Sequence, residues 1–127
     1  MAQRKLFNHV DKVCEQEFDA SVTQLAALLY VVKHPGCLQK ELTQALSLKK
    51  SAVTGLIMRM EKNRLVERIV NEEDARAIKL YPTPSGSQKS VDLLPYIDQL
   101  NQTFRDEFSD EEIQTVLKFL NFIIKRF

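Results

Sequence analysis

One segment of this sequence carries side chains that are suited to contact with nucleic acid. Between Lys49 and Lys62, residues at helical spacing form two different faces. Small residues permit close approach to DNA, hydroxyl groups bond to base edges or phosphates, and cations attract phosphates. One face has these properties and comprises Lys50, Ser51, Thr54, Gly55, Met58 and Arg59. The segment is therefore predicted to be a helix that enters the DNA major groove.

The residues around this helix predict how it is held in place. Its second face is apolar and comprises Val53, Leu56, Ile57 and Met60. A supporting helix is expected over 39–46, with a turn at 47–49. Two strands follow, 65–70 and 77–81, and polar turn residues lie between them at 71–74. The order of helix, turn, helix and hairpin predicts a winged helix-turn-helix, which is a mainly α fold with a small β-hairpin wing.

The same segment matches a known family in the order and spacing of its motifs. The matching residues are Gln39-Lys40-Glu41-Leu42, Lys50-Ser51-Ala52-Val53-Thr54, Glu61-Lys62, Leu65-Val66, Arg68, Asp74-Ala75-Arg76 and Thr83-Pro84-Ser85-Gly86. With these motifs the chain resembles the multiple-antibiotic-resistance regulator (MarR) family of DNA-binding transcriptional regulators. The Asp-x-Arg signature of the wing is the most specific of them, whereas the outer helices match only in their pattern.

The resemblance implies roles for individual residues. Arg76 would reach into the minor groove from the wing tip, where a narrow groove concentrates negative potential, and Asp74 would hold the hairpin. The alternative for these two residues is a surface ion pair in a β-turn. We predict that Ser51, Thr54 and Arg59 contribute most to sequence reading. The full predicted DNA-binding set is Gln39, Lys49, Lys50, Ser51, Thr54, Gly55, Met58, Arg59, Arg68, Asp74 and Arg76.

The outer segments are expected to join two copies of the chain. Residues 1–127 are read as one domain, with a DNA-binding core at 21–83 and dimerisation helices at 1–18 and 84–127. The last helix repeats apolar residues at helical spacing beyond what one small partner helix needs. A homodimer would read a near-palindromic operator. The family resemblance implies repression as the commoner outcome and a small aromatic effector.

Capping residues predict where the helices begin. Capping boxes are expected at Ser21 with Gln24 and at Ser109 with the glutamate three residues later. Thr83 should cap a long helix that runs to about Phe104 and is kinked or interrupted at Pro95.

The helix predicted between Lys49 and Lys62, which would be the recognition helix, departs from the family pattern at its end. Arg64 stands where the family usually has glycine. A left-handed residue is still needed there, and asparagine adopts that conformation more readily than most residues. Asn63 is therefore expected to take it.

Composition excludes several other classes of protein. The net charge is only +1, but residues 37–80 carry nine basic and six acidic residues, so the basic excess lies in the DNA-binding segment. The two cysteines, Cys14 and Cys37, are far apart, which predicts a reducing, cytoplasmic environment. The sequence contains no membrane-spanning run, Gly-rich phosphate loop, nucleophile elbow or metal-spaced His/Cys cluster. We therefore predict neither an enzyme nor a cofactor or metal.

A second class of function is also compatible with these residues. In a winged-helix protein-interaction module, the face predicted to read DNA would instead dock a protein. Met58 favours this alternative, because an exposed methionine can rest on protein as well as on thymine methyl groups. Lys49, Lys50 and Arg76 favour DNA. A protein-docking face should not need Arg76.

Overall fold

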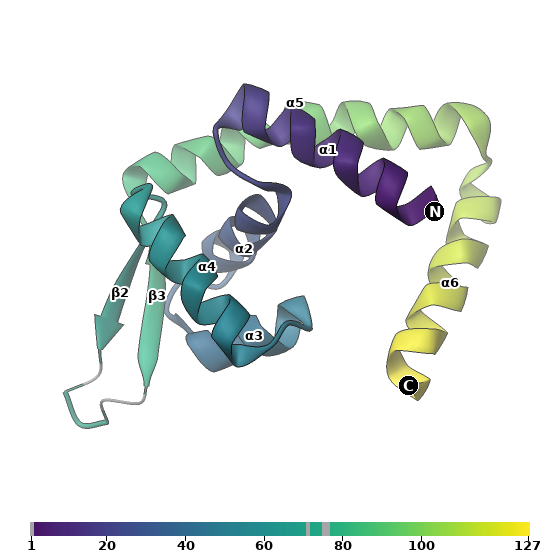
Figure 1. The fold of residues 1–127 in the computed structure, drawn as a ribbon. Coiled ribbons are helices and arrows are strands. Elements are labelled where there is room, and N and C mark those ends of the chain that lie inside the picture. The colour runs from purple at the N-terminus through teal and green to yellow at the C-terminus, as the bar shows by residue number, and fades with distance from the viewer. Residues whose placement is uncertain (1, 71, 75–76) are drawn as a thin grey trace. The chain divides into compact units, whose positions relative to one another are not determined.

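The computed structural model describes residues 2–70, 72–74 and 77–127. It divides into two compact units, Met1–Asp92 and Leu93–Phe127. The elements in chain order are α1 (Ala2–Phe18), α2 (Val22–Lys33), β1 (Cys37–Leu38), α3 (Gln39–Leu46), α4 (Lys50–Lys62), β2 (Val66–Val70), β3 (Ile78–Pro82), α5 (Pro84–Glu107) and α6 (Asp110–Arg126) (Figure 1). No helix in these described ranges combines the length and the apolar content needed to cross a bilayer.

The first unit contains the predicted helix-turn-helix and wing. Helix α3 is followed by its C-cap, Ser47, which is left-handed with a φ of 52°, and α4 begins three residues after Ser47. Strands β2 and β3 then form an antiparallel hairpin, the wing, which extends away from the helices (Figure 1). A third strand, β1, pairs with the other edge of β3 and was not predicted. Two residues are too short for the alternating pattern that identifies a strand in sequence.

The core of the first unit lies against the apolar face of α4. The four apolar residues of α4 that were predicted to anchor it are all at most 2% exposed: Val53, Leu56, Ile57 and Met60. They share the interior with fully buried leucines from α2, α3, β3 and the start of the wing, namely Leu25, Leu28, Leu42, Leu65 and Leu80. Burying one such side chain contributes about 1.5–3 kcal/mol, so this face fixes the orientation of α4. The predicted anchoring face is confirmed.

The end of α4 differs from the prediction. Asn63 has a φ of −81°, and Arg64 itself is left-handed with a φ of 60°. The Leu65 N–H donates to the Met60 carbonyl at 2.9 Å, and the Arg64 N–H donates to the Glu61 carbonyl at 3.0 Å. This is the bonding of a Schellman motif, whose left-handed residue stands one position beyond the cap. Arg64 therefore takes the conformation that the family usually assigns to glycine.

The Asn63 side chain forms a hydrogen bond to another helix. Its Nδ2 donates to Oε1 of Gln24 on α2 at 3.2 Å. The Ser21 hydroxyl caps α2 as predicted, accepting from the Gln24 N–H at 3.2 Å. The Gln24 amide, however, bonds to Asn63 instead of closing a capping box. A tertiary contact has replaced the local one.

Helix α5 begins as predicted and continues further than expected. The Thr83 hydroxyl accepts from the Gly86 N–H at 2.9 Å, and Pro84 occupies the first turn. The helix runs without a break through Pro95 to Glu107, so the predicted end near Phe104 was early and an interruption does not occur. A proline removes one helical hydrogen bond, and the remaining turns of this 24-residue helix maintain it.

The second unit ends with α6, which has an apolar face and no buried residue along its described length. Ser109 and Glu112 form the predicted capping box, with N···O distances of 3.1 and 3.0 Å. Hydrogen bonding to the Glu112 carboxyl from the backbone and side chain of Ser109 lowers the pKa of that carboxyl. Large apolar side chains are exposed along the helix: Val116, Leu117, Phe119, Leu120, Phe122, Ile123 and Ile124.

Candidate nucleic-acid interface

Helix α4 presents the predicted reading face to solvent. Ser51 and Arg59 are exposed, Met58 is 56% exposed, and Thr54 and Gly55 are half-buried. Lys49 and Lys50 are exposed at the beginning of the helix. Because the opposite face is packed into the core, α4 cannot turn this face inward without losing that burial. The described structure therefore gathers seven of the predicted DNA-binding residues along one helix.

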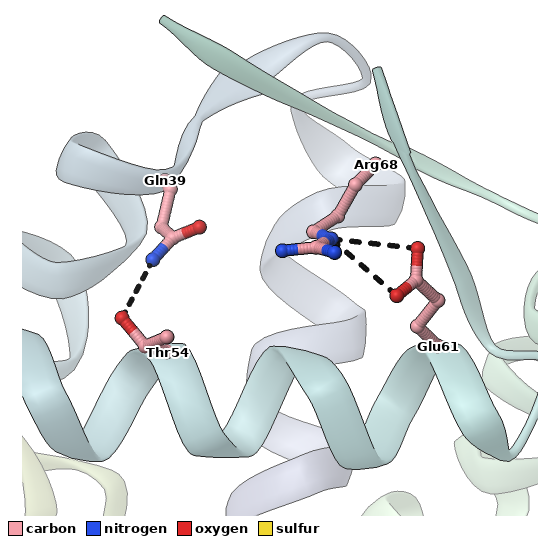
Figure 2. A network of polar contacts seen from close by, with 4 residues as sticks. All are labelled: Gln39, Thr54, Glu61 and Arg68. Atoms are coloured by element: carbon pink, nitrogen blue, oxygen red, sulfur yellow. Dashed lines mark hydrogen bonds and ion pairs between the residues drawn. The ribbon is translucent and has the colours of Figure 1, made fainter. Parts of the chain in front are cut away.

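A hydrogen bond joins this helix to the supporting helix. Nε2 of Gln39, the first residue of α3, donates to Oγ1 of Thr54 at 3.1 Å (Figure 2). The Thr54 hydroxyl in turn donates to the Lys50 carbonyl at 2.9 Å. A hydroxyl has one proton and two lone pairs, so one acceptor position remains free for an external donor. Two residues predicted separately to contact DNA are thus in contact with each other.

The wing is joined to the other end of α4. Nε of Arg68 on β2 lies 3.4 Å from each carboxylate oxygen of Glu61 (Figure 2). The side chains of Arg68 and Glu61 are 36% and 41% exposed, so the pair contributes about 0–1 kcal/mol to stability. Glu61 was matched to the family but was not predicted as a site residue. Its contact with Arg68 needs the strand to fold back over the helix, which residue spacing does not reveal.

Gly55 differs from the other glycines in its surroundings. Gly36 has a φ of 84°, and a Cβ at Gly86 would lie 2.1 Å from the Leu65 carbonyl oxygen. A Cβ at Gly55 would meet only Nη1 of Arg59, at an ordinary distance of 3.5 Å. The packing around Gly55 within this chain therefore does not require glycine.

The tip of the wing lies only partly within the described residues. Asp74 is exposed, and its backbone carbonyl accepts from the Ala77 N–H at 2.9 Å. Arg76, predicted to enter the minor groove, lies outside the residues that the structure describes. Its role remains a prediction from the sequence.

Both cysteines are buried, at 2% exposure for Cys14 and 5% for Cys37. Burial raises the pKa of the Cys14 thiol, and the charges of Asp11 and Glu15 raise it further. Burial also raises the pKa of the Cys37 thiol. A protonated, buried thiol is a poor nucleophile, so this geometry favours a packing role for Cys14.

Sequence comparisons relate this chain to named regulators. A family model described as "MarR family" matches residues 18–77. The HTH-type transcriptional regulator BilQ of Clostridioides difficile is 27% identical over 96 residues, which are 76% of this chain and 65% of BilQ. The uncharacterized HTH-type transcriptional regulator YsmB of Bacillus subtilis is 32% identical over 80 residues, 63% of this chain and 55% of YsmB. The matched region thus spans less than two thirds of either relative.

A comparison with solved structures addresses the fold. The crystal structure of the S. aureus MepR–DNA complex superposes with a TM-score of 0.88 at 24% identity, covering 99% of this chain and 92% of MepR. This likeness concerns the fold. It confirms the predicted mainly α winged helix-turn-helix.

Proposed function

Because this chain belongs to the MarR family, we propose that it regulates transcription by binding double-stranded DNA. The observation that carries the proposal is the exposed face of α4, with Ser51, Met58 and Arg59 opposite an apolar face that is at most 2% exposed. Such a helix can enter the major groove while its orientation stays fixed. Lys49, Lys50 and Arg68 would contact phosphates, which makes binding dependent on salt.

The proposal includes a homodimer with a near-palindromic operator. We assign residues 21–83 to DNA binding and residues 1–18 and 84–127 to dimerisation. Two recognition helices related by a two-fold axis would enter successive major grooves one helical turn apart. Repression is the proposed outcome, as in most of the family. A small aromatic effector would act by favouring a dimer whose recognition helices no longer match the operator.

The exposed apolar face of α6 leads to a prediction about assembly. Light scattering at micromolar concentration should give twice the chain mass of 14.7 kDa. Ile124→Glu should shift the protein toward monomer, because Ile124 is 74% exposed in the single chain and a buried charge in the dimer would be costly. Asn121→Glu adds the same charge outside the apolar repeat and should leave the dimer intact. A wild-type monomer would contradict the proposal.

Base preference provides a second prediction. The Thr54 hydroxyl can still accept one hydrogen bond from a base amino group, and Arg59 can donate to guanine. In a binding-selection assay, Arg59→Ala and Thr54→Ala should each relax preference at different operator positions, by about 1–3 kcal/mol for a good base contact. If both variants select the same sequences as wild type, these residues do not read bases.

The test of the proposal as a whole is selection of genomic DNA fragments by the purified protein at physiological salt. Enrichment of a near-palindrome would support it, and the neighbouring genes would indicate what is regulated. The competing function is a winged-helix protein-interaction module, favoured by the exposed Met58. A folded dimer that enriches no fragment would favour that module.

A further inference from the structure

Polar groups at the centre of the predicted DNA-reading face of α4 already form hydrogen bonds within the protein. The Thr54 hydroxyl donates its proton to the Lys50 carbonyl and accepts from Gln39. It can therefore accept a bond from a base but cannot donate one. Of the neighbouring side chains on α4, Met58 is the large one that is both apolar and exposed, at 56%.

Exposure of one methionine is common on protein surfaces and would decide nothing alone. The second observation is Gly55, three residues earlier, which places it beside Met58 on the helix surface. Gly55 has no positive φ, and an added Cβ would meet only the end of the Arg59 side chain at 3.5 Å. A glycine in a helix interior is less stable than alanine, so its presence here has a cost that the fold does not require. The group nearest the space beside Met58 is therefore the end of a flexible, exposed side chain, which can move aside.

We propose that Met58 is a specificity-determining residue that contacts the 5-methyl group of a thymine, with Gly55 providing the room for close approach. In the major groove, the thymine methyl is the apolar group that distinguishes one base edge from the others. A flexible thioether side chain adapts to such a group, and no hydrogen bond is required. This inference rests on the proposed DNA-binding function and adds to it the base that Met58 recognises.

Deoxyuridine provides the test, because it pairs as thymine does but lacks the methyl group. Duplexes of the selected operator would be made with each symmetric pair of thymines replaced by deoxyuridine, and binding measured by fluorescence anisotropy. For wild type, one pair of replacements should weaken binding about fourfold per methyl, or roughly fifteenfold for both half-sites. Met58→Ala should bind the thymine and deoxyuridine duplexes equally at that pair. Met58→Leu, which keeps an apolar side chain of similar volume, should retain the discrimination.

Gly55→Ala tests the close approach separately. It should raise the thermal stability of the protein and weaken binding to the thymine operator. If Gly55→Ala binds the operator with unchanged affinity, Gly55 does not provide the room for close approach to DNA.

The failures of the inference and of the proposed function are distinguishable. If wild type binds the operator but no deoxyuridine replacement matters, or if Met58→Ala still discriminates at the same pair, the thymine contact is wrong and DNA binding stands. If wild type enriches no operator at all, the proposed function fails and the inference fails with it.

Discussion

Replacing Gly86 with alanine is expected to lower the free energy of unfolding by about 3 kcal/mol, the upper end of typical overpacking costs. A Cβ at this position would lie 2.1 Å from the Leu65 carbonyl oxygen and 3.2 Å from Cδ1 of Leu28. The first contact is with backbone, which cannot move aside as a flexible side chain can. The start of α5 would therefore have to shift away from the end of α4.

That shift would break a set of hydrogen bonds at the same junction. The Leu65 carbonyl accepts from the Thr83 N–H at 3.1 Å, and the Arg64 carbonyl accepts from the Thr83 hydroxyl. The Thr83 hydroxyl also caps α5 through the Gly86 N–H. Loss of a helix cap alone costs about 1 kcal/mol. The motif Thr83 to Gly86 therefore attaches α5 to the DNA-binding core.

Urea and thermal denaturation at one fixed protein concentration would measure the change, because the stability of the proposed dimer would depend on concentration. Gly55→Ala is the matched control, since it is the same substitution in a helix without a close contact. It should stabilise the protein by about 0.5–1 kcal/mol. A Gly86→Ala protein as stable as wild type would show that the junction relaxes at little cost, contrary to this account.

The sequence predicts the parts of the fold that depend on local pattern. The apolar repeat Val53, Leu56, Ile57 and Met60 determines which way α4 faces, because helical geometry alone places these residues on one side. The caps at Ser21, Thr83 and Ser109 are also local, and their hydroxyl groups accept the predicted bonds. Such features need only a few neighbouring residues to specify them.

Features that depend on tertiary position were missed or misassigned. Asn63 has a favourable propensity for the left-handed conformation, but its side chain bonds to Gln24 on another helix while Arg64 closes the turn. The Arg68–Glu61 pair and the Gln39–Thr54 bond each join two elements whose approach is set by the buried core. The sequence therefore proposes the DNA-binding residues one by one, whereas the contacts that these residues make within the protein required the structure.

Arg76→Ala is expected to weaken operator binding roughly a hundredfold while leaving the protein folded. A charge-assisted contact contributes about 1.5 kcal/mol, and a dimer would lose two of them. Loss of two cationic contacts should also reduce the slope of log affinity against log salt by about 2 in magnitude. Anisotropy titrations across a series of salt concentrations would measure both quantities.

The control and the salt series together separate DNA binding from protein docking. Arg105→Ala removes the same charge from α5, beyond the DNA-binding core, and should leave the affinity and the slope near those of wild type. If Arg76→Ala behaves like Arg105→Ala, the wing does not contact the minor groove, even if α4 still reads bases. If wild-type binding itself is weak and insensitive to sequence, the exposed Met58 face is better explained as a protein-docking surface. Arg76 thus tests the wing, whereas Met58 and Gly55 test the recognition helix, and neither result depends on the other.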